Sequence, residues 1–241
     1  MAFIESRFYS ESTGLHSSVN VILPDSGAPK RCLWLLHGLS DDHSAWMRNS
    51  AVEKHVEGRN LAVIMPAVGR SFYSDMVHGG KYWTYVSEEL PKKMKGFFHL
   101  PTGRKNHFAA GLSMGGYGAF KLALKRPDWI SAAASFSGAL DIGRRGFFHQ
   151  DFQHIFGPGK PVPAGDDLMK LARAAARPGF PKLRLFQSCG TEDYLYESNQ
   201  RFRAKAESLK LDLSYEEGPG DHTWAYWDMM LPRALDWFLK N

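Results

Sequence analysis

The segment GLSMGG, residues 111–116, places one serine between two glycines that each lie two positions away from it. In the pattern Gly-x-Ser-x-Gly, a sharp turn between a strand and a helix holds the serine hydroxyl out as a nucleophile for acyl transfer. Side chains at 111 and 115 would collide with neighbouring elements, which explains the glycines. The sequence therefore predicts that Ser113 is a nucleophile. The alternative is a glycine-rich turn with an incidental serine.

A serine hydroxyl is a weak nucleophile at neutral pH, so it needs a base, and the base needs an acid that orients it. In enzymes with this serine turn, the acid follows the serine and the histidine comes last. Asp193 follows a predicted strand in CGTEDYLY, and His222 lies in the late loop GPGDHTW. These two residues are the predicted acid and base.

The chain contains competing residues for both roles. Glu192 is the alternative acid, but a shorter side chain reaches an imidazole with fewer free rotations. Asp221 fits better as a cap of the helix that follows it. His149 and His154 come too early in the chain for the expected order.

The tetrahedral intermediate of acyl transfer needs two N–H donors. One is expected from Met114, directly after the nucleophile, and the other from the loop after the third strand, LLHGLSDD. Gly38 permits close backbone approach there, so the N–H of Leu39 is the predicted second donor. In the alternative without a catalytic role, His37 and Gly38 simply end a strand.

Substrate-binding residues are predicted from aromatic side chains near these motifs. Trp46 lies just past the oxyanion loop and Trp83 precedes a helix, so both are candidates, although such rings more often belong to a core. A small pocket walled by large rings would favour acetyl to butyryl groups. No clustered Cys/His pattern suggests zinc, and we expect no metal and no cofactor.

The elements that must position these residues alternate along the chain. Near-continuous apolar strands alternate with amphipathic helices, which indicates a mostly parallel sheet covered on both faces. Strands are expected over 3–9, 19–24, 32–36, 61–66, 107–112, 130–136, 182–188 and 211–217, and helices over 82–98, 115–125, 167–176, 197–209 and 224–239. The first two strands are joined by a short link, which suits an antiparallel hairpin at the sheet edge.

One domain, residues 1–241, is expected, because no repeat or flexible linker interrupts this order. Residues 139–165 interrupt the alternation of strands and helices with four phenylalanines followed by turn-forming residues. This excursion is either a lid or pocket wall, or a surface segment that packs its own aromatic rings.

Six segments together resemble the putative-esterase family: LWLLHGLSDDHSAW, FYSDMVHGGKYWTYVSEELP, AGLSMGGYGAFKLAL, SFSGAL, CGTEDYLYESN and GDHTWAYWD. That family includes esterase D (S-formylglutathione hydrolase), the antigen 85 mycolyltransferases and the bacterial tributyrin esterases, and the last branch is the most similar. The resemblance implies an α/β-hydrolase fold. It also implies a nucleophile at Ser113, an acid at Asp193, a base at His222 and oxyanion donors at Leu39 and Met114.

The expected function is that of a serine carboxylesterase acting on short acyl esters through an acyl-enzyme. An S-formylglutathione thioesterase is the main alternative, followed by an acyltransferase and by a non-catalytic binding protein that keeps the fold.

The bulk properties limit the partners. Of 241 residues, 44% are hydrophobic and 23% charged, and the net charge of +5 is spread along the chain, so nucleic-acid binding is not expected. No apolar run is long enough to span a bilayer. The start of the chain does not look like a secretory signal, and two cysteines do not make a disulfide scaffold, so a cytoplasmic location is expected. A homo-oligomer is left open.

Overall fold

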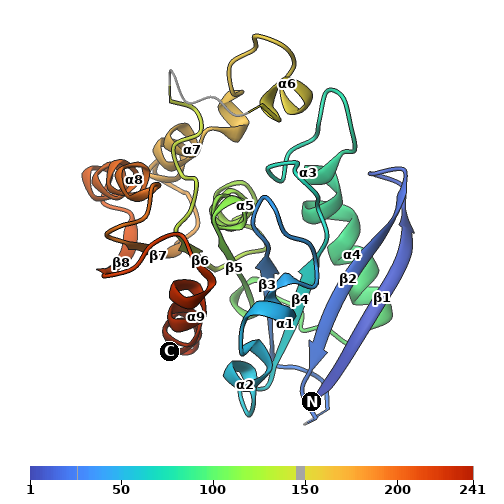
Figure 1. The fold of residues 1–241 in the computed structure, drawn as a ribbon. Coiled ribbons are helices and arrows are strands. Elements are labelled where there is room, and N and C mark those ends of the chain that lie inside the picture. Colours follow the sequence, from blue (N-terminus) through green and yellow to red (C-terminus); the bar gives the residue numbers. More distant parts are fainter. Residues whose placement is uncertain (26, 145–149, 241) are drawn as a thin grey trace.

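The computed structural model describes residues 1–25, 27–144 and 150–240. Within this part of the chain, a single eight-stranded sheet has the order β1-β2-β4-β3-β5-β6-β7-β8 (Figure 1). The strands are β1 (Ala2–Ser10), β2 (Leu15–Leu23), β3 (Arg31–Leu36), β4 (Leu61–Pro66), β5 (His107–Leu112), β6 (Ala132–Phe136), β7 (Arg184–Gly190) and β8 (Asp212–Gly218).

The directions of the strands confirm the expected fold class. From β4 to β8 every neighbouring pair is parallel. The hairpin of β1 and β2 is antiparallel and lies at the edge, with a register from Ala2↔Leu23 to Ser10↔Leu15. Strand β2 also pairs with β4 antiparallel.

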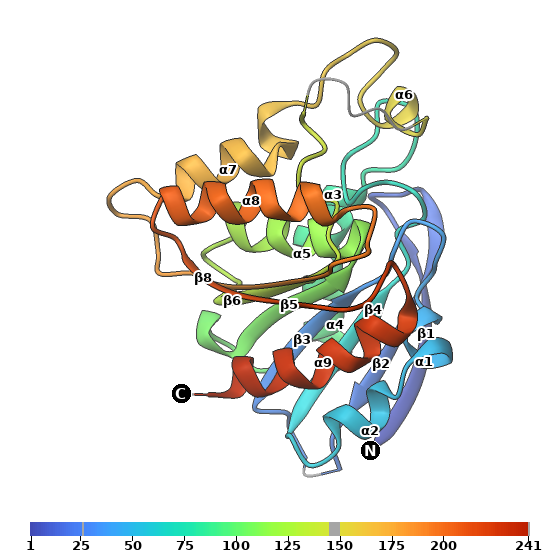
Figure 2. The same cartoon turned by 60° about the vertical axis from the view of Figure 1, so that its left-hand side comes forward.

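Helices cover both faces of the sheet (Figure 2). One face carries α3 (Tyr82–Thr84), α4 (Leu90–Phe97), α5 (Met114–Lys125), α7 (Leu168–Ala175) and α8 (Tyr196–Ser208), and the other carries α1 (Ala45–Asn49), α2 (Val52–Val56) and α9 (Trp224–Leu239). Alternate side chains of a central strand enter opposite cores. In β3, Trp34 and Leu36 join the core of the first face, and Leu33 and Leu35 join the other. This two-sided burial explains why the central strands are apolar throughout.

The helix expected over 82–98 is interrupted. A π-helical turn, Tyr85–Glu89, separates α3 from α4. Pro91, in the first turn of α4, has no N–H to donate to the carbonyl of Ser87. That carbonyl instead accepts a hydrogen bond from Arg126. The sequence reasoning also missed α1, α2 and α6 (Phe152–Ile155), which are too short to show a clear period.

The excursion is described at 139–144 and 150–165, while His149, Phe147 and Phe148 lie outside the described residues. Its described second half is tied to the loop between β4 and α3. The N–H groups of Val77 and His78 donate to the carbonyls of Ile155 and His154, each at 2.9 Å. Two distant segments therefore form one layer above the carboxyl ends of the strands (Figure 1).

Among the described residues, no helix combines the length and the apolar character that crossing a bilayer requires.

Candidate active site

Ser113 occupies the turn between β5 and α5. Its backbone has φ 53° and ψ −119°, a conformation that costs energy for any residue with a Cβ. The turn is tight enough to exclude side chains on both sides of it. A Cβ on Gly111 would lie 2.4 Å from the carbonyl oxygen of Gly115, and a Cβ on Gly115 would lie 2.3 Å from that of Leu36. These contacts match the collisions that the sequence motif predicts.

Asp193 and His222 meet at the same end of the sheet. Asp193 follows β7, His222 lies between β8 and α9, and Nδ1 of His222 is 2.9 Å from Oδ2 of Asp193. Asp193 is 4% exposed, and its Oδ1 also accepts a hydrogen bond from the N–H of Leu195 at 2.8 Å. Burial raises the pKa of this carboxyl, but the hydrogen bonds from His222 and Leu195 outweigh burial, so the pKa is lowered. Asp193 is therefore an anion at neutral pH, suited to fix the imidazole.

Glu192, the alternative acid, holds the backbone of the histidine loop. Its carboxylate accepts a hydrogen bond from the N–H of Gly220 at 2.5 Å, and its own N–H donates to the carbonyl of Gly220 at 3.0 Å. The loops can come this close because Gly190 has no side chain: a Cβ there would lie 2.1 Å from the carbonyl oxygen of Gly220. The two adjacent acids thus have separate tasks, one on the imidazole and one on the loop that carries it.

Tyr194 connects the serine with the histidine. Its ring centroid lies 4.5 Å from that of His222. The side chain of Ser113 also lowers the pKa of Tyr194 in part, which places this tyrosine near the serine as well.

The backbone after β3 is oriented by His37, which is 1% exposed. Its Nε2 accepts a hydrogen bond from the N–H of Val68 at 3.0 Å, so its Nδ1 carries the proton and donates to the carbonyl of Gly38 at 2.7 Å. In a planar trans peptide the C=O and the next N–H point in opposite directions. The N–H of Leu39 is therefore turned away from His37. Burial lowers the pKa of His37, which keeps this ring neutral.

Met114 begins α5 and is buried. The first N–H groups of a helix have no carbonyl one turn earlier, and the helix dipole places partial positive charge there. The N–H of Met114 is thus available to an anion that forms at Ser113. Leu39 and Met114 therefore remain the predicted donor pair.

The two predicted pocket residues have other contacts. Trp46 is 1% exposed, and its indole N–H donates to the carbonyl of Leu36 at 3.0 Å. Trp83 stacks on the ammonium groups of Lys125 and Lys121 along the flank of α5. These positions do not favour a substrate contact, because one ring is in the core and the other lies two to three turns from the start of α5.

Two of the competing residues are also placed. His154 lies in α6, where its backbone pairs with His78. Asp221 is exposed and does not cap α9 with its side chain as expected: its backbone carbonyl accepts from the N–H of Thr223 at 2.9 Å.

Sequence reasoning missed the contributions of His37, Glu192 and Tyr194. All three lie next to a predicted site residue or within two positions of one, in segments that carried the family resemblance. Their closeness in sequence to the predicted site residues was the only available indication, and it does not show which neighbouring side chain points into the site.

The comparisons with known proteins agree with this geometry. A family model described as putative esterase matches residues 10–238. An acetyl esterase of Caldicellulosiruptor saccharolyticus is 26% identical over 263 residues, covering 100% of this chain and 99% of the relative. FphF, a fluorophosphonate-binding serine hydrolase of Staphylococcus aureus, has a solved structure that is 32% identical with a TM-score of 0.93, covering 100% of this chain and 99% of that one. The S-formylglutathione hydrolase FrmB of the same organism is 32% identical with a TM-score of 0.89, covering 99% of both chains. The fold is that of the α/β-hydrolases, and the chain belongs to the putative esterase family of serine ester hydrolases.

Proposed function

We propose that this protein hydrolyses esters of short acyl groups, acetyl to butyryl, through an acyl-enzyme on Ser113. His222 takes the proton of the serine hydroxyl as Ser113 attacks the ester carbonyl. Asp193 holds the imidazole in the correct tautomer and stabilises its cation. The N–H groups of Leu39 and Met114 bind the oxyanion. The alcohol departs with the proton from His222, and water then releases the acid by the same steps in reverse.

The observation that carries this proposal is the pairing of Asp193 with His222 beside the strained turn of Ser113. The hydrogen bond of 2.9 Å at Nδ1 leaves the other ring nitrogen of His222 for the serine. The strained backbone at Ser113 supports the same role, because strain of this kind is retained where the fold needs a residue in one conformation.

The size of the acyl group is inferred from the surroundings of the base. Trp227 lies 4.9 Å from His222, and Trp224 lies 5.4 Å from Trp227 and 5.1 Å from Trp46, measured between ring centroids. These rings reduce the space beside the base. The name of the acetyl esterase relative supports a small acyl group as well.

Replacing the nucleophile tests the proposal directly. Ser113→Ala is expected to lower kcat/KM for p-nitrophenyl acetate by about 10⁴-fold or more, and to abolish labelling by a fluorophosphonate probe. Ser131→Ala is the matched control, because the hydroxyl of Ser131 donates to the carbonyl of His107, at the opposite end of β5. Near-normal hydrolysis by the Ser113 variant would reject the assignment. Comparing acetate, butyrate, tributyrin and decanoate substrates in the unmodified protein tests the acyl length.

A thioesterase is the second candidate, because the hydrolase FrmB, 32% identical, is named for a thioester substrate. The same residues can cleave either bond. Turnover of S-formylglutathione far above that of simple acetate esters would favour this function.

We also propose that residues 1–241 act as one domain in which the described second half of the excursion, 150–165, is a fixed wall of the site. The backbone pairing of Val77 and His78 with the excursion supports a wall rather than a mobile lid.

A cytoplasmic location is supported by the two buried free thiols, Cys32 and Cys189.

A further inference from the structure

Tyr194 is exposed although it touches two residues of the site. It follows Asp193 directly and is 75% exposed. Its ring is tilted by 50° against the imidazole of His222 at a centroid distance of 4.5 Å. The side chain of Ser113 lowers the pKa of Tyr194 in part, so the serine is also close to it. The side chain therefore lies on the solvent side of the nucleophile and the base.

This position corresponds to the path of the departing alcohol. Nδ1 of His222 is occupied by Asp193, and Trp227 packs edge-on against the ring at 4.9 Å. The nitrogen left to give a proton to the alcohol is Nε2, because Asp193 holds Nδ1. An exposed group beside the imidazole and near the serine is well placed to reach the oxygen that receives this proton.

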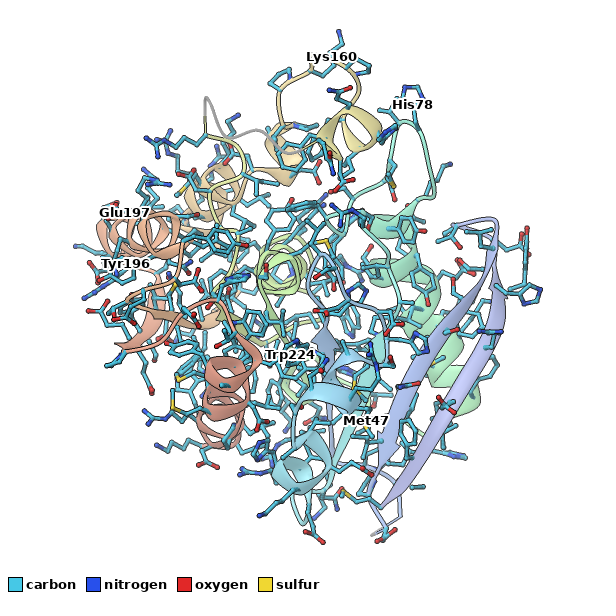
Figure 3. The ribbon with its side chains drawn as sticks, in the orientation of Figure 1. Met47, His78, Lys160, Tyr196, Glu197 and Trp224 are labelled. Carbon is cyan, nitrogen blue, oxygen red and sulfur yellow. The ribbon has the colours of Figure 1, made fainter. Side chains whose placement is uncertain are left out.

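Other tyrosines near the site have structural hydrogen-bond partners. Tyr73 donates to the carbonyl of His37, and Tyr196 donates to the carboxylate of Glu217 at 3.0 Å. Figure 3 shows Tyr196 at the outer side of α8, remote from Trp224 at the start of α9. Tyr194, in contrast, packs against the imidazole of the proposed base, which gains and loses a proton during the reaction.

The phenol of Tyr194 is a donor under working conditions. The pKa of Tyr194 is raised, because the part of the side chain that packs against the site loses water and because the negative charge of Asp193 is near; Ser113 lowers it without reversing the shift. The hydroxyl therefore keeps its proton at neutral pH.

We propose that the hydroxyl of Tyr194 donates a hydrogen bond to the oxygen of the departing alcohol, and that it thereby selects oxygen esters of ordinary alcohols over thioesters. The inference rests on the proposed function, since it assigns a role within the acylation step at Ser113.

The chemistry of the step explains the selectivity. When the tetrahedral intermediate collapses, the bond between the carbonyl carbon and the alcohol oxygen breaks, and its electron pair moves to that oxygen. The oxygen takes the proton from Nε2 of His222, while Tyr194 keeps its own proton and stabilises the negative charge that builds up. An alkoxide is a strong base and a poor leaving group, as is hydroxide, so a hydrogen bond to the departing oxygen matters. A thiolate leaves easily, because a thiol has a pKa of about 8.5, and sulfur is a weak acceptor.

The test is a series of acetyl substrates whose leaving groups differ in basicity: ethyl acetate, phenyl acetate, p-nitrophenyl acetate and S-phenyl thioacetate. Their kcat/KM values report acylation, the step in which the leaving group departs. Tyr194→Phe removes only the hydroxyl. We expect kcat/KM to fall about tenfold to 100-fold for ethyl acetate, less for phenyl acetate, and by less than about threefold for the two activated substrates.

Tyr196→Phe is the matched control, because it removes a phenol hydroxyl two positions away on the outer side of α8. It should leave all four values unchanged. Fluorophosphonate labelling of Tyr194→Phe at the normal rate would show that Ser113 and His222 still work together. A uniform loss across the series, or no loss with ethyl acetate, would overturn the inference. Failure of the unmodified protein to hydrolyse any acetyl ester would instead reject the proposed function.

Discussion

The two glycines around Ser113 differ from most glycines of the chain because backbone atoms, which cannot move aside, occupy the space of their missing side chains. At Gly115, the carbonyl oxygens of Leu36 and His37 lie 2.3 Å and 2.7 Å from the position of a Cβ. Strand β3 and helix α5 are therefore in contact through this residue. The same contact brings the loop of Leu39 next to the start of α5, so the packing of one glycine sets the spacing between the two oxyanion donors.

Gly115→Ala should force α5 away from β3. We expect the free energy of unfolding to fall by about 2–3 kcal/mol, and kcat with p-nitrophenyl acetate to fall more than tenfold because the oxyanion donors separate. Urea unfolding and steady-state kinetics measure both effects.

Gly96→Ala is the control for this substitution. Gly96 lies in α4, and no neighbouring atom lies within 4 Å of the place that an added methyl group would take. Alanine there should raise stability by about 0.5–1 kcal/mol and leave kcat unchanged. Equal behaviour of the two variants would contradict the packing argument.

At the scale of elements, α5 is joined to the layer above it by Lys121. The side chain is fully buried, and its ammonium donates to the carbonyl of Tyr73 and the hydroxyl of Ser74, each at 2.8 Å. It also forms an ion pair with Asp166, which directly follows the excursion. Burial lowers the pKa of Lys121 to about 8, against the opposing effect of Asp166. One cation thus links the helix of the nucleophile, the loop after β4 and the proposed wall.

Lys121→Met should lower the free energy of unfolding by about 3 kcal/mol, because a carboxylate and a backbone carbonyl lose their partner in the interior. The control is Lys125→Met, one turn later on α5. Its ammonium lies 4.2 Å from the ring centroid of Trp83 and is partly exposed, so the loss should stay below about 1 kcal/mol. Urea unfolding curves measure both losses. Equally small losses in the two variants would contradict the proposed structural role of Lys121.

Elements with strong periodic patterns were predictable, and their special features were not. Strand β5 and helix α9 match the predicted bounds because their apolar patterns are continuous. The π-helical turn before α4 depends on the partner of the Ser87 carbonyl, which comes from Arg126, 39 positions later. Asp193 was predictable as the acid, but the hold of Glu192 on the backbone of the histidine loop was not, because it rests on the approach of Gly190 to Gly220, which is also non-local. Local patterns carry no information about such contacts.

At the scale of the whole molecule, two buried histidines make stability depend on pH. Burial lowers the pKa values of His37 and His107, so the folded protein keeps both rings neutral at pH values where the unfolded chain binds protons. Since the unfolded rings titrate near about 6.5, stability from these groups is complete above that pH and is lost as the pH falls below it.

The expected loss is at most about 1.4 kcal/mol per pH unit for each histidine. Urea unfolding at several pH values between about 7.5 and 5.5 measures it. His107→Gln should reduce the slope while leaving activity intact, because His107 lies at the start of β5, opposite to Ser113. An unchanged slope in this variant would show that His107 does not contribute.

Strand β8 ends the sheet on the side of His222, and all of its residues are at least partly exposed. Of the proposed catalytic residues, the base alone is attached to such a strand, since Ser113 follows the interior strand β5. An edge strand opens more readily than an interior one. On warming, we therefore expect activity to be lost through fraying of the edge strand β8 before the core melts. This loss should reverse on cooling, provided that the hydrogen bonds between Glu192 and Gly220 re-form.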